Sequence, residues 1–429
     1  MEPVHLGNNK ILLVTQLYPP ESGGNASRIS DMADGLKNLG ADISILSPVP
    51  TFPFGSFKRT WRPWVRKSER EIDVTNLWTW QPSSVDPGFA SRITYYLVYA
   101  VHAAIWALVH KGNYDIIVTS VPPLFVNLAG LLPGLVFGKK WVIDVRDLWI
   151  DASISLGFIK KDSIMEKLSR LFEQLCYTRT DLICVTTEET KKKILARYDH
   201  LQPEKIVVVP NGVDISRFYP QGEKKPAQLI YTGNVGYAQD LETAVLAMGT
   251  VGRTHRALLL IVGEGDMKER LKSLVQEKGL GNYVIFKDLV PREEIPRLIS
   301  ESYLGLAPLK DIESLEYAIP SKVYEYMACG IPFVGCGKGE IVNIAVRSKA
   351  GIITDNVPES IADAIGKLLD DPGKVAGMGR GGREYVTQYC ERKAIARKFY
   401  EYIVEAGARH SMEARTDGSG CTLNNYTSR

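Results

Sequence analysis

Residues 319–336 read IPSKVYEYMACGIPFVGC and place a short helix directly before a buried strand. The proline and serine that precede Lys322 are a helix start signal, and Gly330 with the proline after Ile331 ends the helix. The last four residues of the stretch are apolar or glycine, which is typical of a strand that is covered on both faces. This stretch therefore predicts a helix that leads into a strand of a buried parallel sheet.

The same alternation recurs along the chain in two series of apolar runs. The first series is ILLVT, ISIL, VTNLW, DIIVTS, WVIDV, LICVTT and IVVVP, and the second is LIYTG, LLLIVG, VIFKDL, LGLAPL, PFVGC and GIIT. Near-continuous apolar strands between helices are typical of parallel sheets with helices on both faces. The 429 residues are too many for one ordinary core. The sequence therefore predicts two doubly wound α/β domains.

The predicted domain boundary lies in residues 209–228, VPNGVDISRFYPQGEKKPAQ, which are rich in proline, glycine and charge. We expect the N-terminal domain to span residues 1–208 and the C-terminal domain residues 209–390. A helix with an apolar stripe is expected at about 391–405. Residues 407–429 have the composition of a disordered tail.

Composition and charge exclude some classes of function. A net charge of +3 is too mild to argue by itself for a nucleic-acid-binding protein, so no nucleic-acid partner is predicted from it. The six cysteines lack metal-ligand spacing, so no metal site is predicted and a cytoplasmic location is favoured over secretion. The N-terminal residues MEPVHLGNNK also lack the layout of a signal peptide.

Two apolar stretches raise the question of a membrane. Residues 94–109 are uncharged over 16 residues, and residues 121–138 reach 18 with Pro133 in their middle. Both are at the short end of what crosses a bilayer, and each is followed by a strand-like run. Buried core helices are favoured over spanning ones, and the spanning alternative stays open.

Ligands of open parallel sheets bind beyond the carboxyl ends of the strands. Glycine-containing loops that lead into helices lie at three such ends: Gly23 and Gly24, then Gly233 with Asn234 and Gly236, then Gly263 with Gly265. Adjacent glycines let backbone amides approach a ligand, and a helix start favours an anion. A plain surface loop is the alternative at the first of these. No GxGxxG is complete, which argues against a dinucleotide-dependent dehydrogenase.

Two further candidates are charged. Arg146 and Asp147 follow the strand WVIDV, where an internal ion pair of Arg146 with Asp144 or Asp147 is the alternative to a catalytic role. On the helix at 321, Lys322 and Glu325 share a face. They could form a simple surface ion pair. The alternative is that the ammonium, beside the free amides at Ser321, holds a diphosphate while the carboxylate accepts from a ribose diol.

The set of motifs resembles the retaining nucleotide-sugar glycosyltransferases of family four. The stretches that carry the resemblance are PPESGGNASRISDMADGLKNLGADISIL, VPNGVDISRFYP, YTGNVGYAQDLETAVLAM, IVGEGDMKERLKSLV and IPSKVYEYMACGIPFVG. Within that family, RDLWID and IPSK look most like the enzymes that add aminosugars in O-antigen or capsule synthesis. The resemblance implies a GT-B fold, in which two Rossmann-like domains face a cleft and the final helix returns to the first domain.

The resemblance also implies roles for single residues. Glu325, the second acid of the family's E-x7-E pattern, would hold the donor ribose, and Lys322 would bind the donor diphosphate. The backbone near Val290 and Pro291 would contact the base, and Gly24 would line the phosphate.

Three positions depart from the family pattern. The first acid of E-x7-E corresponds to Tyr317, with Glu316 one position away. The usual phosphate-binding arginine and lysine correspond to Asn234 and Gln239, which are both neutral, and the usual histidine before Asp147 corresponds to Arg146.

The function implied is transfer of a sugar, such as an N-acetylhexosamine, from a nucleotide diphosphate donor to a lipid-linked or polysaccharide acceptor. UDP is the expected nucleotide, retention the expected stereochemistry, and no tightly bound cofactor or metal is expected. The alternatives are an enzyme resembling the UDP-GlcNAc 2-epimerases and a non-catalytic nucleotide-sugar binding protein.

Residues 51–67, TFPFGSFKRTWRPWVRK, mix five aromatic side chains with five cations. This composition suits the interface of an anionic membrane, where the enzyme could act as a peripheral protein on the inner face. Binding of nucleic acid and a charged loop packed through its aromatics are the alternatives.

Overall fold

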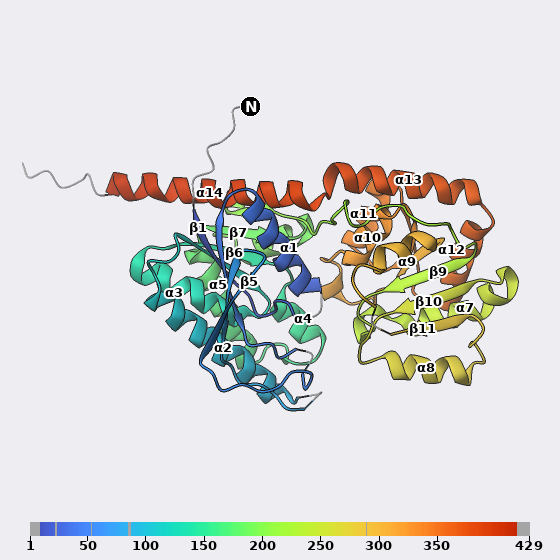
Figure 1. Cartoon of the computed structure of the whole chain (residues 1–429), viewed down its shortest axis with the longest axis horizontal. Coiled ribbons are helices and arrows are strands. Elements are labelled where there is room, and N and C mark those ends of the chain that lie inside the picture. Colours follow the sequence, from blue (N-terminus) through green and yellow to red (C-terminus); the bar gives the residue numbers. More distant parts are fainter. Residues whose placement is uncertain (1–8, 22–23, 53, 85–86, 289, 418–429) are drawn as a thin grey trace, which may run out of the picture.

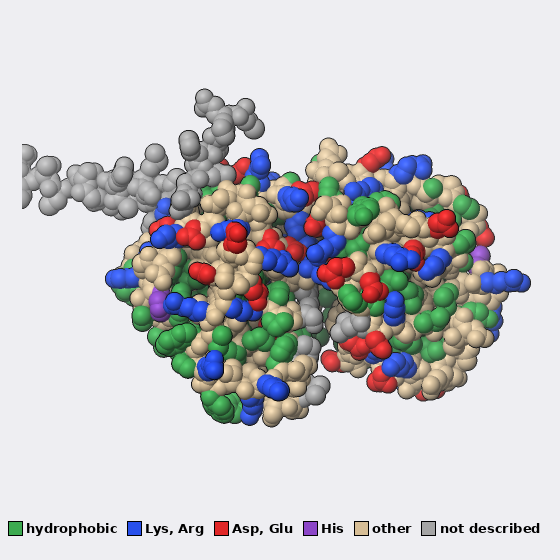
Figure 2. Space-filling view, viewed as in Figure 1, with side chains coloured by type: hydrophobic (Ala, Val, Ile, Leu, Met, Phe, Trp, Pro, Cys, Tyr) green, Lys and Arg blue, Asp and Glu red, His purple; other side chains and the backbone are tan. Residues whose placement is uncertain are grey.

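The computed structural model describes residues 9–21, 24–52, 54–84, 87–288 and 290–417. Two α/β lobes lie side by side, and the last two helices run along one edge of both (Figure 1). A groove separates the lobes on the opposite side (Figure 2). The two predicted doubly wound domains are confirmed, with one sheet in each.

The first domain contains an eight-stranded sheet in the order β3-β4-β2-β1-β5-β6-β7-β8. All neighbours are parallel except β3, which pairs antiparallel with β4 at the edge. The strands are β1 (Lys10–Val14), β2 (Asp42–Pro48), β3 (Trp64–Glu69), β4 (Ile72–Leu77), β5 (Ile116–Val121), β6 (Lys140–Val145), β7 (Leu182–Val185) and β8 (Ile206–Val208).

Helices cover both faces of this sheet. One face carries α1 (Gly24–Asn38) and α14 (Arg392–Asp417). The other face carries α2 (Phe89–Val109), α3 (Leu128–Phe137), α5 (Ile164–Arg179) and α6 (Glu188–Arg197), whereas the short α4 (Trp149–Ser155) follows β6. Short 3-10 turns, η1 (Leu124–Asn127) and η2 (Pro203–Lys205), complete the domain.

The second domain contains a six-stranded parallel sheet in the order β11-β10-β9-β12-β13-β14. Its strands are β9 (Gln228–Thr232), β10 (Leu258–Val262), β11 (Val284–Lys287), β12 (Leu304–Ala307), β13 (Phe333–Cys336) and β14 (Gly351–Thr354). Its helices are α7 (Leu241–His255), α8 (Lys268–Glu277), α9 (Ile295–Glu301), α10 (Ser321–Ala328), α11 (Glu340–Ser348), α12 (Pro358–Leu369) and α13 (Pro372–Tyr389), with 3-10 turns η3 (Tyr237–Gln239) and η4 (Glu313–Leu315).

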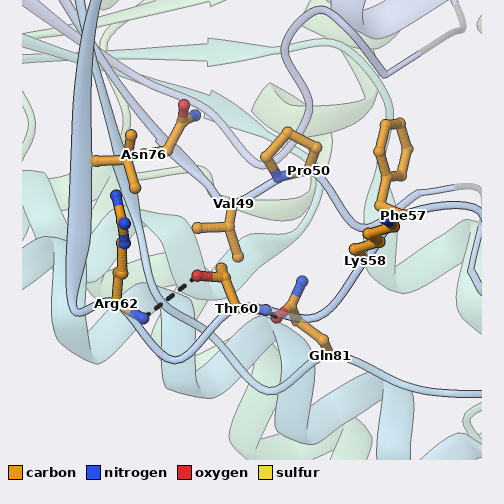
Figure 3. A pocket seen from close by; sticks show the side chains of 9 residues that line it. Val49, Pro50, Phe57, Lys58, Thr60, Arg62, Asn76 and Gln81 are labelled. Atoms are coloured by element: carbon orange, nitrogen blue, oxygen red, sulfur yellow. Dashed lines mark hydrogen bonds between the residues drawn. The ribbon is translucent and has the colours of Figure 1, made fainter.

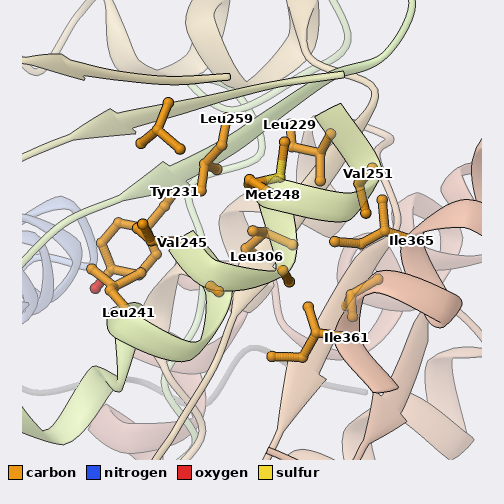
Figure 4. Packing of buried hydrophobic residues seen from close by; sticks show 14 of the residues in the cluster. Leu229, Tyr231, Leu241, Val245, Met248, Val251, Leu259, Leu306, Ile361 and Ile365 are labelled. Atoms are coloured by element: carbon orange, nitrogen blue, oxygen red, sulfur yellow. The ribbon is translucent and has the colours of Figure 1, made fainter. Parts of the chain in front are cut away.

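The core of the second domain has a layer on each face of the sheet. On one face, Met248 of α7 and Ile361 of α12 pack against Leu259 and Leu306 of the strands (Figure 4). On the other face, α9, α10 and α11 pack around Phe333. These layers hold the starts of the helices at the carboxyl edge of the sheet, where the candidate loops lie.

Two chain segments connect the domains and touch each other. The Val213 amide donates to the Cys390 carbonyl (2.9 Å), and the Arg392 amide donates to the Val213 carbonyl (3.1 Å). A Cβ on Gly212 would lie 2.5 Å from Ile395 Cδ1, so only glycine fits this crossing without a shift. The apolar stripe of α14 then packs on α1 in the core of the first domain.

The structure adds a strand that was not expected and corrects one expectation. The end of the segment 51–67 forms β3, whose polar composition hid the strand. The turn that joins β3 to β4 places Arg70 (φ 50°) and Glu71 (φ 61°) in the left-handed region without glycine, so the usual hairpin signal is missing. The tail expected at 407–429 is helical to Asp417, as the continuation of α14, in a segment that contains the helix-favouring residues alanine and arginine; residues 418–429 lie outside the described residues.

Candidate functional site

The α10 start places one lysine in the interior beside the second sheet. The Lys322 side chain is only 9% exposed, and its Nζ donates to the Tyr231 hydroxyl (2.8 Å) and lies 4.1 Å from the centre of that ring. Burial is the largest cause that lowers the pKa of Lys322 from 10.5 to about 7, and nearby Glu325 opposes it. Among the described residues no ion pair joins Lys322 to Glu325, so the surface-pair interpretation is wrong.

The glycine loops pack directly beneath this lysine. A Cβ built on Gly233 would lie 3.9 Å from Lys322 Nζ, so the loop after β9 and the ammonium adjoin. A Cβ on Gly263 would lie 1.9 Å from the Gly233 carbonyl oxygen, and one on Gly265 would lie 2.4 Å from that of Val235. The two loops therefore approach backbone to backbone, which only glycine allows.

The neutral residues of the first loop serve the loop itself. The Gln239 side-chain oxygen accepts from the Gly236 amide (3.1 Å). A Cβ on Gly236 would lie 2.5 Å from the side-chain nitrogen of Asn234. Val290 is half-buried and packs on the core layer around α10. These positions build the walls of the site but bring no charge to it.

Glu325 lies one turn along α10, within the field of two arginines that no sequence motif had indicated. Burial raises the pKa of Glu325, whereas Arg392, Arg292 and Lys322 lower it. Arg292 and Arg392 both pair with Asp31 of α1, and Arg292 does so at 3.0 Å. These partners lie 261 and 361 residues from Asp31, so no local pattern could have revealed them.

Arg146 and Asp147 follow β6 on the facing domain. Arg146 is buried, its Nη1 donates to the Asn25 carbonyl (3.2 Å), and its Nε has no partner among the described residues. Asp144 pairs with Arg28 (3.5 Å), so the alternative of an internal ion pair between Arg146 and Asp144 is wrong. Burial lowers the pKa of Arg146 to about 10, with Arg28 as the next cause. Asp147 is exposed, and no ion pair with Arg146 is present in the described part.

The glycine turn after β1 is described only in part. Gly23 lies outside the described residues, and Gly24 is the first residue of α1. The Arg146 contact at Asn25 ties the start of α1 to the end of β6. The structure thus brings Arg146 to the start of α1, the helix that follows the predicted glycine turn.

Tyr317, at the position of the missing acid, belongs to the contact between the domains. Its carbonyl accepts from the Thr187 hydroxyl (2.8 Å), and its ring packs on the first-domain core. Lys193 lies over the same ring at 5.4 Å. The carbonyl contact would be available to any residue, but a carboxylate could not make the interdomain contacts of the ring in the same way.

A separate cavity of about 330 Å³ lies away from Lys322, at the carboxyl ends of β2 and β4 (Figure 3). Its wall includes Lys58, Arg62, Asn76 and Gln81 with Phe57. Two cations and two amides suit an anionic or hydroxyl-rich group. The cavity is thus a second polar recess on the first domain.

Chemically, the α10 site joins a desolvated amine, glycine-loop amides, a helix start and a carboxylate one turn away. Such a group of donors suits a diphosphate, and the carboxylate suits a diol. Comparison with known sequences agrees with this chemistry. Residues 213–385 match the family Glycosyl transferases group 1, and residues 23–212 match the Glycosyl transferase 4-like domain.

A curated relative and two solved structures extend over nearly the whole chain. The putative colanic acid biosynthesis glycosyl transferase WcaI of Escherichia coli is 24% identical and covers 92% of this chain and 99% of its own. Sucrose-phosphate synthase from Thermosynechococcus elongatus superposes with a TM-score of 0.73 at 18% identity, covering 94% and 100%. Anabaena HepE, solved with UDP and glucose, superposes with a TM-score of 0.68 at 15% identity, covering 92% and 99%.

Proposed function

Since the chain belongs to the group 1 glycosyltransferases of GT-B fold, which take a nucleotide-sugar donor, we propose that it transfers an aminosugar from UDP with retention of anomeric configuration. The single observation that carries the donor site is the buried Lys322 amine beside the Gly233 loop. A buried cation without an anion is costly, and a diphosphate would supply the missing partner.

In the proposed mechanism the donor diphosphate lies between the Gly233 loop and the start of α10. Negative charge grows on the β-phosphate as the glycosidic bond breaks, and cations and amides fixed in advance lower that barrier. Lys322 is the cation on the donor side. Glu325 anchors the ribose hydroxyls, held in place by the field of Arg292 and Arg392.

Arg146 and Asp147 face the donor from the first domain in this proposal. Arg146 holds the start of α1 through the Asn25 carbonyl, and so it would place the glycine turn at 23–24 against the phosphate. Asp147, which is exposed, is placed to contact the acceptor or the transferred sugar. Closure of the domains would exclude water that would otherwise hydrolyse the donor.

The acceptor is proposed to be lipid-linked or a growing surface polysaccharide, with the enzyme at the inner face of the cytoplasmic membrane. The relative WcaI carries colanic acid biosynthesis in its name, and the resemblance to aminosugar transferases of O-antigen and capsule synthesis supports the sugar. In the segment 51–67, Trp61 and Trp64 are exposed, so they are available to a membrane interface. Phe54 is buried and Arg59 donates to the Gln81 carbonyl, so part of the segment is internal.

A donor panel tests the proposal. The pure protein is incubated with UDP-, GDP- and ADP-sugars, with and without a membrane extract that contains acceptor. Acceptor-dependent release of UDP from a UDP-aminosugar, with an α-linked product from an α-linked donor, is the expected result. An isomerised donor without acceptor would indicate an epimerase. Tight UDP binding without any turnover would indicate a non-catalytic binding protein. This alternative is suggested by Tyr317, which stands at the position of the first acid of the family pattern.

A further inference from the structure

Helix α5 turns its apolar stripe outward. Ile164, Leu168, Leu171 and Leu175 recur at helical spacing and are 41% to 77% exposed. Surface helices of globular proteins normally bury such a stripe and expose the polar face. The exposed apolar stripe of α5 is therefore a candidate binding surface for an apolar partner.

The inward side of α5 explains why the helix keeps this orientation. Glu173 is 2% exposed, accepts from the Tyr198 hydroxyl and receives a second bond from Arg170 (3.4 Å). Arg170 and Arg197 both pair with Asp151 of α4. This buried ionic network fixes the polar face of α5 against the domain, so rotation of the stripe inward would leave the network unpaired.

Two neighbouring helices add apolar area to the same side. On α2, Leu97, Val101, Ile105 and Val109 lie on one face and are exposed, and the range 135–137 at the end of α3 is exposed as well. Helix α2 contacts α3, and α3 contacts α5. Figure 2 shows hydrophobic side chains gathered over α2 and α3 on the first domain. We call this surface of α2, α3 and α5 the outer apolar face.

Helix α2 lies along the domain and does not stand apart from it. It is the one helix among the described residues that is long and apolar enough to cross a membrane by length and composition. Its opposite side buries Tyr95, Tyr99 and Trp106 in the sheet core. A helix held in this way can offer its outer side to a bilayer without crossing it.

The charges around the outer apolar face are mainly positive. Lys111, Lys160, Lys161, Lys167 and Arg179 are exposed at its rim and outnumber the exposed carboxylate of Asp162, and the described residues of α2, α3 and α5 include no exposed carboxylate. We propose that the outer apolar face docks on an anionic lipid bilayer, with its aliphatic side chains in the interface and its cations at the headgroups. A second copy of the chain fits less well, because a two-fold contact would set these cations against each other.

The face also begins close to the proposed site. Helix α4 starts two residues after Asp147 and leads to Leu156 and Phe158, both exposed at the edge of the face. Phe158 stacks on Phe89 at the start of α2 with ring centres 6.4 Å apart. Docking would therefore bring a lipid-linked acceptor to the Asp147 side. This benefit rests on the proposed function, but docking itself does not.

Flotation with vesicles tests the proposal on the full chain. Wild-type protein is expected to float with vesicles of three parts phosphatidylcholine and one part phosphatidylglycerol. The double variant Leu168→Gln with Leu171→Gln should reduce the partition coefficient at least tenfold, because two side chains leave the interface. Val346→Gln removes an equally exposed apolar side chain from the second domain and should bind as wild type. Neutralising Lys160, Lys161 and Lys167 should abolish the preference for the anionic vesicles.

UDP affinity, measured by calorimetry, separates docking from the donor site. The affinity should not change in any of these variants, since all the substituted residues lie outside that site. If the wild-type protein does not bind UDP, that result counts against the proposed function but not against docking. Undiminished flotation of the Leu168 and Leu171 variant overturns the proposal. So does a wild-type dimer that ignores vesicles and becomes monomeric in that variant, which would make the face an interface between copies.

Discussion

Lys322→Met provides the sharpest test of the donor site, because it removes the charge and keeps the volume of the side chain. In the free protein the amine donates to the Tyr231 hydroxyl (2.8 Å), and the side chain is almost wholly buried. A charge-assisted contact with a diphosphate is worth about 1.5 to 3 kcal/mol. We therefore expect UDP affinity to fall by roughly ten- to hundredfold and transfer to fall at least as much.

The lowered pKa of Lys322, about 7, gives this variant a pH signature. Above that pH the free amine is mainly neutral, whereas bound diphosphate favours the ammonium, so binding takes up a proton. Wild-type affinity for UDP should fall by up to about tenfold per pH unit above 7, since one unit corresponds to about 1.4 kcal/mol. Calorimetry at pH 8 in buffers of different ionisation enthalpy measures the proton uptake, and Lys322→Met should show none.

Stability should move in the opposite direction. Between pH 7 and 10.5 the unfolded chain binds more protons at this lysine than the folded protein does. Burial of the amine therefore lowers the free energy of unfolding at pH 7, and this free energy rises as the pH rises through that window. Lys322→Met should therefore raise the free energy of unfolding at pH 7 by at least about 1 kcal/mol. A variant that is less stable, or one that binds UDP with the wild-type affinity and pH slope, would refute the reasoning.

Three further changes test the surroundings of the site. Glu325→Gln keeps the shape but weakens the grip on the ribose, so UDP affinity by calorimetry should fall about tenfold with an unchanged melting temperature; equal affinity would remove this acid from the site. Asp31→Asn leaves Arg292 and Arg392 without their shared partner, so thermal unfolding should show a loss of about 2 kcal/mol, and no loss would mean that the arginines are satisfied elsewhere. Gly212→Ala inserts a Cβ 2.5 Å from Ile395 Cδ1 and should lower the melting temperature of both domains together. An unchanged melting curve would show that the two connecting segments shift to accept the Cβ.

The architecture was predictable because the parallel strands are rich in apolar residues. All thirteen apolar runs are strands in the structure, since a strand that is covered on both faces is mostly apolar. Strand β3 escaped because its residues alternate between exposed and half-exposed, and its turn uses Arg70 and Glu71 where glycine or asparagine is usual. A sheet edge in water needs no apolar pattern.

The candidate site was predictable only where its residues are close in sequence. Lys322 and Glu325 share one short helix, and Gly233 and Gly263 each follow a strand, so their types and positions indicated a phosphate site. Arg292 and Arg392 depend on contacts across the domain junction, which composition and periodicity do not encode. The sequence also could not show that Lys322 forms no ion pair with Glu325. The partner of Lys322 is Tyr231, which lies on the sheet beneath α10.

The loop that contains Asn234 and Gln239 is neutral. The cations that balance the charge of a bound diphosphate must therefore come from other elements of the fold. The loop uses Gln239 to hold the Gly236 amide, so charge must come from elsewhere. Lys310, whose amide donates to the Ala238 carbonyl (3.0 Å) and whose ammonium lies over the Tyr237 ring, is a cation at the edge of that loop. A fixed cation stabilises growing phosphate charge wherever in the chain it originates, because the interaction depends on distance and burial alone. The loss of charge within one loop is therefore compatible with a functional diphosphate site.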